Sequence, residues 1–411
     1  MRLRVFTLGA LLALVLGAMV SRPDSRFRAA AASEDRICPG EVIVRLKPGR
    51  DVNRINSRYG TFVKGHIAGT GDYLLGLPPG EDEKECLNRI EKDKDLEFAD
   101  ANYIFELPEV RQTSQAFIDQ VSQAFIDGRF PVNFYGQPSL ANLTLVDAHR
   151  ISRGAGVRVA VLDTGLDFRH RLFMGRIAGP YYDFVDNDLS PDDEPNGLGF
   201  GHGTGVAGLI ALTAPDATLL PLRVFNREGV GTSYNIARAI RFAADNGAPV
   251  INMSFGLNQS DKLIEEAIKY AGKRAVFIAS AGNRNQDYIE YPAERKDRTI
   301  SVTSTTAKDI KAPFANYHKD IDVTSPGVSL YSAYPGERWA WWSGTSFSTA
   351  LVSGEVALML AIDRELEAND MKKILKDSGV KIDDLNERYK NKLGRRVDFR
   401  AAVDRARSKM K

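Results

Sequence analysis

Cysteine is nearly absent from this chain of 411 residues. Cys38 and Cys86 are the only two, and both lie in the first quarter of the sequence. In an oxidising compartment they could form one disulfide; otherwise they are two separate thiols. A cysteine nucleophile and a cysteine-ligated zinc site are therefore excluded from everything after Cys86.

A large excess of either charge is also lacking, because 55 Lys and Arg stand against 53 Asp and Glu. Dedicated nucleic-acid-binding proteins usually show a strong basic excess or stripe, so we expect no nucleic-acid partner. Basic residues do gather near the C-terminus, but acidic residues alternate with them, which indicates a solvated helix face. The five histidines form no HExxH pattern, which disfavours a zinc peptidase.

Long apolar runs without charge are confined to the N-terminus, at residues 6–20, after Arg2 and Arg4. This run is shorter than the roughly 20 residues that a spanning helix needs. Small residues at 29–32 offer a cleavage site, as in a secretory signal peptide, which we place at 1–32. An uncleaved anchor is the alternative. We expect a secreted or extracytoplasmic protein.

Residues 33–106 predict a small α+β domain. The pattern is strand, helix, strand, helix, strand, at residues 41–46, 51–59, 73–77, 81–92 and 98–105. A unit of this size is an accessory domain.

Residues 107–137 follow as a polar stretch that contains SQAFID twice, at 114–119 and 122–127. Two copies are too few for a solenoid, so we interpret this stretch as an exposed linker with a processing region.

Residues 138–411 alternate between strands and helices, which predicts an α/β domain with a central, mostly parallel sheet. Apolar runs typical of buried strands lie at 157–162, 250–254, 275–280 and 300–304. A helical pattern covers 234–246, and Ser260 is a candidate cap for a helix that ends at Gly272. In such sheets the active site gathers beyond the carboxyl ends of the strands.

Three residues in this domain carry a possible chemistry. Asp163 directly follows the strand 157–162, His202 lies in a glycine-rich turn, and Ser346 begins an apolar run that predicts a buried helix. Taken singly, each has a structural interpretation: a turn aspartate, a structural or metal-binding histidine, and a helix cap. Asn283, just past another buried strand, could equally be a turn residue.

Taken together, the four side chains predict nucleophilic catalysis. Serine is a poor nucleophile at neutral pH and needs a base, which His202 can supply while Asp163 orients it. The backbone N–H of Ser346 and the Asn283 amide could then hold the oxyanion, and each such donor is worth about 3–4 kcal/mol. The order Asp, His, Ser is one of several in which this geometry occurs.

At these residues the chain resembles the subtilisin-like serine proteases, or subtilases. VAVLDTGLD at 159–167, GHGTGVAG at 201–208 and GTSFSTALVSG at 344–354 are similar to the aspartate, histidine and serine motifs of that family. INMSFG at 251–256 and SAGN at 280–283 resemble its substrate-binding and oxyanion motifs. The resemblance covers roughly 140–403. It implies a three-layer fold and a serine endopeptidase acting on protein or peptide substrates through an acyl-enzyme.

The resemblance also assigns accessory roles. Residues 41–106 are similar to the family's inhibitory, folding-assisting propeptides, so the chain is expected to be a zymogen inhibited by its own propeptide. Ser254, Phe255 and Gly256 are expected to bind substrate and line the primary pocket. Arg284 would lie at the mouth of that pocket, and on this basis we expect basic side chains to be poorly accepted there.

Some positions depart from the family pattern. Gly205 replaces a common histidine, Ala350 replaces a usual proline and is followed by Leu351, and Leu172 stands where a calcium-binding aspartate is frequent. Leucine cannot ligate calcium. An acidic loop could substitute, although a solvated loop is the simpler interpretation; its residues are Asp183, Asp186, Asp188, Asp192, Asp193 and Glu194. We expect no metal site and no required cofactor, with calcium the one candidate.

Two other function classes fit the sequence less well. A catalytically inactive subtilase fold that acts as a binding module would have lost a triad residue, and none is lost. An α/β-hydrolase esterase needs a Gly-x-Ser-x-Gly elbow and a histidine after the serine, and both are missing. We expect a monomer.

Overall fold

The computed structural model describes residues 36–110, 125–128 and 134–409. These residues belong to one compact unit, Asp35–Lys411. The expected signal peptide, most of the linker and the first SQAFID copy lie outside the described residues.

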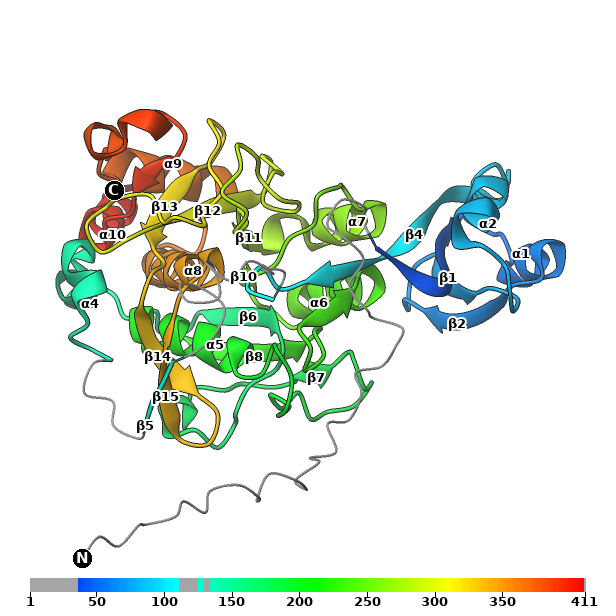
Figure 1. The fold of residues 1–411 in the computed structure, drawn as a ribbon, viewed down its shortest axis with the longest axis horizontal. Coiled ribbons are helices and arrows are strands. Elements are labelled where there is room, and N and C mark those ends of the chain that lie inside the picture. The colour runs from blue at the N-terminus through cyan, green and yellow to red at the C-terminus, as the bar shows by residue number, and fades with distance from the viewer. Residues whose placement is uncertain (1–35, 111–124, 129–133, 410–411) are drawn as a thin grey trace, which may run out of the picture. The chain divides into compact units, whose positions relative to one another are not determined.

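The first described region is a small α+β structure built on an antiparallel sheet (Figure 1). Its elements are β1 (Ile37–Leu46), α1 (Val52–Tyr59), β2 (Phe62–His66), β3 (Asp72–Gly76), α2 (Glu83–Ile90) and β4 (Leu96–Glu106). The strand β2 was not predicted, because its side chains are mostly exposed and show no apolar alternation. Cys86 lies in the core of this region, and both Cys38 and Cys86 are free thiols.

The larger region contains an eight-stranded sheet in the order β16-β13-β12-β11-β10-β6-β8-β7, and its strands pair in parallel. The strands are β6 (Arg158–Asp163), β7 (Tyr182–Asp183), β8 (Thr218–Arg223), β10 (Val250–Met253), β11 (Val276–Ser280), β12 (Thr299–Thr305), β13 (Val323–Pro326) and β16 (Arg395–Arg396). All four strands expected in this domain are present.

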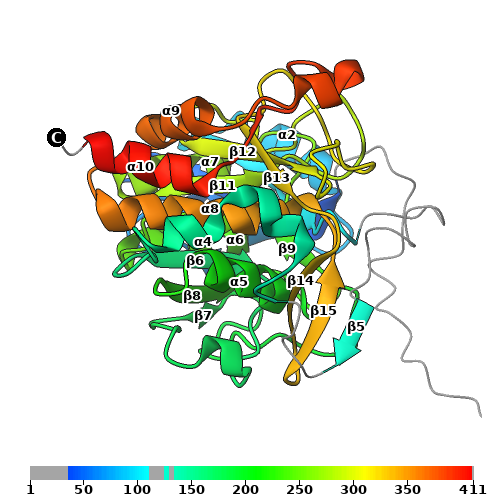
Figure 2. The ribbon, with the colours of Figure 1, turned by 90° about the vertical axis from the view of Figure 1, so that its left-hand side faces the viewer.

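Helices cover both faces of this sheet, as the side chains of β6 show. Val159 and Val161 pack into one apolar cluster, while Ala160 and Leu162 pack into another. The first cluster includes residues of α5 (His202–Thr213), α8 (Thr345–Ile362), α9 (Ala368–Ser378) and α10 (Phe399–Lys409); the second includes residues of α6 (Ser233–Asp245) and α7 (Lys262–Ala271). Figure 2 shows α8 in the middle of the domain beside α10. The fold is the expected three-layer, subtilisin-like arrangement.

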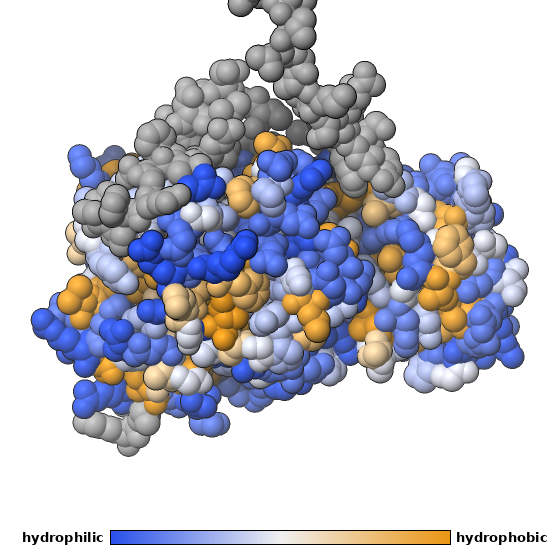
Figure 3. Space-filling view, turned by 90° about the horizontal axis from the view of Figure 1, so that it is seen from below, coloured by the Kyte–Doolittle hydropathy of each residue, from blue (hydrophilic) through white to orange (hydrophobic). Residues whose placement is uncertain are grey.

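Smaller elements complete the domain. They are α4 (Leu145–His149), β9 (Val230–Thr232) and the antiparallel strands β14 (Leu330–Tyr334), β15 (Arg338–Trp342) and β5 (Phe125–Gly128). The strand β5 comes from the predicted linker, where it includes the end of the second SQAFID copy and pairs with β15. On the face drawn in Figure 3, hydrophobic residues are scattered among hydrophilic ones.

The cap of α7 differs from the prediction by one residue. Asp261, rather than Ser260, accepts the N–H of Ile264 at 2.9 Å, and its carboxylate also accepts the hydroxyl of Ser233 at the start of α6. An aspartate whose other oxygen is engaged in this way joins the two helix starts. The sequence pattern alone could not distinguish two adjacent capping residues.

One buried acid in the central helix α8 has no evident partner. Glu355 is fully buried, and neither of its carboxylate oxygens has a hydrogen-bond partner among the described residues. Burial raises its pKa well above the ordinary value, with the Asp398 carboxylate adding to the effect. Burial therefore favours the neutral, protonated form of this side chain.

We expect Glu355→Leu to stabilise the protein, because an unsatisfied buried polar group costs about 1–3 kcal/mol. The raised pKa means that the folded state holds a proton which the unfolded state releases above its ordinary pKa. The wild-type free energy of unfolding should fall as pH rises from about 4.5, and the variant should lose this component. Denaturant unfolding at pH 4 and pH 8 measures both effects. Equal stability of the two proteins at pH 8 would contradict the assignment.

Candidate active site

Asp163 and His202 meet at the carboxyl end of β6. Asp163 is the last residue of β6 and His202 is the first of α5. Nδ1 of His202 lies 2.7 Å from Oδ1 of Asp163, and both side chains are buried. The same oxygen accepts the backbone N–H of Thr164 at 2.8 Å, which fixes the carboxylate. The imidazole is thereby oriented with Nε2 directed away from the strand.

A second buried acid holds the start of α5 in place. Asp193 accepts the backbone N–H groups of Gly201 and Thr204 and the Thr204 hydroxyl, at 2.9, 3.2 and 2.7 Å. Thr164 also donates its hydroxyl to Asp193 at 3.1 Å. Burial raises the pKa of Asp193 to about 6, although these hydrogen bonds oppose the shift. Asp193 thus positions the histidine through the backbone around it.

Ser346 lies in the first turn of α8, with its side chain at the start of the helix. Its hydroxyl donates to the carbonyl of Ser254 at 3.1 Å, and Ser254 donates its own hydroxyl to the Ser346 carbonyl at 3.1 Å. This reciprocal pair joins α8 to the segment that follows β10. The N-terminus of a buried helix also supplies unpaired N–H groups and a positive dipole end at this point.

Asn283 faces the same place from the segment after β11. Its Oδ1 accepts the backbone N–H and the hydroxyl of Thr345, at 3.0 and 2.7 Å. These two bonds fix Oδ1 as the acceptor of the amide and leave Nδ2 as its donor. These hydrogen bonds fix the orientation of the Asn283 amide, which an asparagine in an isolated turn would not have fixed.

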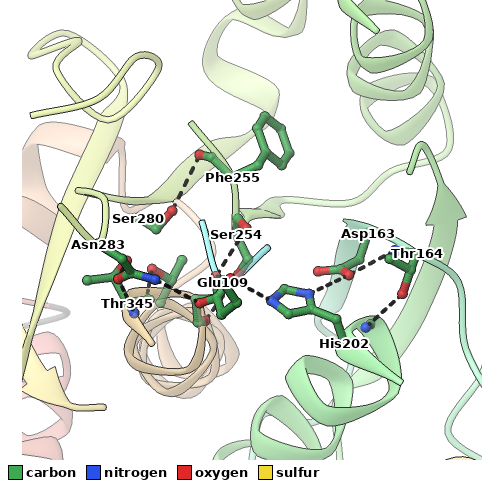
Figure 4. Close-up of polar contacts among 12 residues, drawn as sticks. Glu109, Asp163, Thr164, His202, Ser254, Phe255, Ser280, Asn283 and Thr345 are labelled. Carbon is green, nitrogen blue, oxygen red and sulfur yellow. Dashed lines mark hydrogen bonds and ion pairs between the residues drawn. The ribbon is translucent and has the colours of Figure 1, made fainter. Parts of the chain in front are cut away.

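Three of the four side chains, those of His202, Ser346 and Asn283, converge on a residue that the sequence did not indicate. The Oε2 atom of Glu109 lies 3.1 Å from Nε2 of His202 and 3.0 Å from Oγ of Ser346, while Oε1 accepts from Nδ2 of Asn283 at 3.2 Å (Figure 4). Among the described residues, Ser346 and His202 do not hydrogen-bond each other, since both face this one oxygen. One carboxylate oxygen of Glu109 therefore lies between the Ser346 hydroxyl and the His202 imidazole.

Glu109 also changes the protonation of the histidine. Burial of the imidazole opposes its charged form, but the carboxylates of Asp163 and Glu109 outweigh burial and raise the pKa of His202 to about 10. With Glu109 in place, His202 is an imidazolium at neutral pH. An imidazolium cannot accept the proton of a serine hydroxyl.

The expected substrate-binding segment lies along β4. Ile104–Glu106 of β4 pair antiparallel with Val230–Thr232 of β9, and Glu106 forms an antiparallel bridge with Gly256. Phe255 is buried with its ring edge-on to Phe105, at a centroid distance of 5.8 Å. Leu107 and Glu109 are buried as well, so the start of the predicted exposed linker lies in the active site.

Two departures from the family pattern have a structural reason. A Cβ at Gly205 would lie 2.7 Å from the Trp342 indole, so any larger residue there requires that ring to move. Ala350 and Leu351 are buried in the core around α8.

The acidic loop does not fit a calcium site. The guanidinium of Arg223 is almost fully buried and lies within 2.7 Å of carboxylate oxygens of Asp183, Asp186 and Glu194. Asp193 is committed to α5, and Leu172 is a buried core residue. Among the described residues, no group of three or more His, Cys, Asp or Glu is arranged to hold a metal ion. The cation of this loop is Arg223.

Comparisons with known proteins agree with this fold. Residues 154–400 match the subtilase family, and residues 23–102 match the fervidolysin N-terminal prodomain. The chain is 36% identical to thermitase of Thermoactinomyces vulgaris over 243 residues, which are 56% of this chain and 84% of thermitase. It is 38% identical over 226 residues to a thermophilic serine proteinase of Bacillus sp. strain AK1, covering 52% of this chain and 55% of that protein.

Two solved structures are similar. Fervidolysin from Fervidobacterium pennivorans, described as a keratinolytic enzyme, aligns over 92% of this chain and 62% of its own, with a TM-score of 0.72 and 21% identity, a likeness of fold alone. A cold-adapted subtilisin-like proteinase aligns over 60% of this chain and 90% of its own, with a TM-score of 0.54 and 31% identity. The chain belongs to the subtilase family and is a subtilisin-like serine endopeptidase with an N-terminal prodomain.

Proposed function

We propose that the chain is a secreted zymogen whose peptidase domain cleaves peptide bonds through Ser346, His202 and Asp163. The observation that carries this proposal is the convergence of Ser346, His202 and Asn283 on the carboxylate of Glu109. That carboxylate stands in for the carbonyl of a substrate and the oxyanion formed from it. Export is supported by the N-terminal sequence pattern.

The proposed reaction begins when Oγ of Ser346 attacks the substrate carbonyl carbon and Nε2 of His202 takes the hydroxyl proton. The negative charge that forms on the carbonyl oxygen is held by Nδ2 of Asn283 and by the backbone N–H of Ser346. The carbon–nitrogen bond then breaks, His202 protonates the departing amine, and an acyl-enzyme remains. Water then attacks the acyl carbon and gives a proton to His202; the ester bond to Oγ breaks, His202 returns the proton to Oγ of Ser346, and the acid is released. Asp163 stabilises the imidazolium in both halves.

These steps use only side chains and backbone groups of the chain. No cofactor is required for them, and we propose that the mature enzyme acts as a monomer. The proposed boundaries are a signal peptide at 1–32, a propeptide at 33–106, a linker with the processing region at 107–137 and the peptidase domain at 138–411.

A fluorophosphonate probe tests the proposed chemistry directly. The full chain is expressed and allowed to mature, labelled with the probe, digested and analysed by mass spectrometry. We expect a single phosphonylated residue, Ser346, together with the mass loss that release of the propeptide produces. Heat-denatured chain is the control and should not be labelled. Labelling at another serine, or at none, would contradict the proposed mechanism.

We propose that the precursor is inhibited by Glu109, which lies at the start of the linker directly after the propeptide and occupies the catalytic centre. The strand β4 approaches as an extended peptide paired with β9, and Glu109 then fills the site that the substrate carbonyl would need. The inhibition has an electrostatic part, because Glu109 helps to keep His202 protonated. Release of Glu109 would return to His202 the neutral form that acts as a base.

Glu109→Gln should therefore mature faster than the wild type at pH 7. The raised pKa of His202 means that its pairing with the two carboxylates is complete below about 6.5 and is lost as pH rises through about 10. Wild-type maturation should accelerate toward pH 10, and the variant should show a smaller acceleration. Time courses of the mature mass at several pH values measure this. Glu97→Gln, an exposed change on β4, is the control; a Glu109→Gln variant that matches it at every pH argues against the inhibitory contact.

A further inference from the structure

We propose that Glu290 makes the primary pocket select a Lys or Arg side chain at the residue whose carbonyl is attacked. This inference rests on the proposed function and names the substrate class of that site. Glu290 was not singled out by its sequence, because nothing in the run Tyr288 to Tyr291 marks a buried acid. Its side chain is 1% exposed in the structure.

The Glu290 carboxylate lies between two glycines. A Cβ added to Gly256 would lie 2.3 Å from Oε2 of Glu290, and a Cβ added to Gly282 would lie 2.8 Å from Oε1. Each oxygen thus contacts a different strand end, and only a residue without a side chain fits on either side. The absence of side chains at both positions leaves room for the acid.

The backbone holds Glu290 in this position. Leu257 and Tyr291 exchange two N–H···O=C hydrogen bonds of 2.8 Å, and the N–H of Glu290 donates to the carbonyl of Ala281 at 3.2 Å. The segment is therefore fastened to the chain beyond β10 and to the chain beyond β11. An acid fixed by its backbone is a preorganised partner for a cation.

The same two glycines flank the reacting groups. Gly256 is two residues after Ser254, whose carbonyl accepts the Ser346 hydroxyl, and Gly282 is adjacent to Asn283. A substrate carbonyl held by Ser346 and Asn283 directs its own side chain into the space between these segments. That side chain meets the Glu290 carboxylate.

Arg284 adjusts this charge without cancelling it. Its Nε atom lies 3.3 Å from Oε1 of Glu290, while its side chain is 32% exposed. A partly exposed guanidinium returns to water at little cost, so a substrate cation can take its place beside the buried carboxylate. Arg284 alone would disfavour a basic side chain in the pocket, but its guanidinium is paired with Glu290. An acidic substrate side chain would meet a like charge at this position.

Peptides that differ only at the residue before the scissile bond test the proposal. With matured full-length enzyme, kcat/KM should be highest for Arg and Lys, lower for Phe and lowest for Glu. Glu290→Gln should lower the ratio of Arg to Phe on the order of a hundredfold, as expected when one partner of a buried charge pair is removed. Glu294→Gln, the same change at an exposed position of the same loop, should leave the ratio unchanged.

Two further measurements keep the test sharp if Glu290→Gln folds poorly. Arg284→Gln, at a partly exposed position, should increase the preference for Arg, because it removes an internal cation that competes for Glu290. Benzamidine should inhibit the wild type competitively, while uncharged benzamide should not. An enzyme labelled at Ser346 that prefers Phe to Arg, or that ignores benzamidine, overturns this inference and leaves the proposed function standing. A chain not labelled at Ser346 contradicts the proposed function, and the inference falls with it.

Discussion

Ser346→Ala is expected to abolish proteolysis, with a loss of about 10⁶-fold in kcat, and to leave the chain with its propeptide attached. The change removes the nucleophile while Asn283, His202 and Asp163 stay in place. Alanine is the best helix former, so α8 should be preserved. Casein hydrolysis and the intact mass of the chain measure the two outcomes, and far-UV circular dichroism checks the fold.

The matched control is Ser348→Ala. Ser348 is buried on the same helix, but its hydroxyl bonds the carbonyls of Ser325 and Pro326 rather than Glu109. Its removal should reduce stability by about 1 kcal/mol while the chain still matures and is labelled by the probe. A Ser346→Ala chain that matures and cleaves casein as well as the wild type would refute the assignment of the nucleophile.

Asp163→Asn is expected to lower the rate of acylation about 10⁴-fold with little change of structure. Oδ1 of Asp163 accepts both from His202 and from the N–H of Thr164. An amide cannot supply the negative charge that stabilises the imidazolium during the reaction, and its NH₂ group can favour the wrong histidine tautomer. The base would then be both misoriented and weaker.

The measurement is the rate of fluorophosphonate labelling of the Asp163→Asn chain after its propeptide has been removed by a trace of wild-type enzyme. Asp188→Asn, an exposed change in the neighbouring loop, is the control and should be labelled at the wild-type rate. A labelling rate within tenfold of the wild type would argue that Asp163 only supports the turn in which it lies.

The elements with regular patterns were predictable from the sequence. Buried strands such as β6 show up as short apolar runs, and α6 shows a helical apolar face, so the α/β class followed from local residues. The exposed strand β2 has neither signal and was missed. The observed cap of α7 differs from the predicted one by one residue, because two neighbouring side chains are both able to cap.

The candidate site was predictable only where its motifs are local. Asp163, His202, Asn283 and Ser346 each lie in a distinctive short segment, and the structure brings all four together. Glu109 was missed because it lies 93 residues from His202 and 237 from Ser346 in the sequence. The polar sequence around Glu109 is typical of a linker, and only tertiary contacts place this residue in the candidate site. Glu290 was not predicted for the same reason, because its position depends on tertiary contacts with Gly256 and Gly282.

The contacts of Glu109 couple inhibition to catalysis. The groups that would hold a reacting carbonyl are the same groups that hold the Glu109 carboxylate. A change in one of them should therefore alter both the affinity for substrate and the affinity for Glu109. A chain disabled at Ser346 has also lost one of the donors to Glu109, and its propeptide should bind more weakly than that of the wild-type precursor. The affinity measured for the propeptide in a precursor with Ser346 replaced would therefore be lower than its affinity in the wild-type precursor. Substitutions that weaken the catalytic centre should likewise weaken the binding of Glu109. A less active enzyme would then also be less completely inhibited in its precursor.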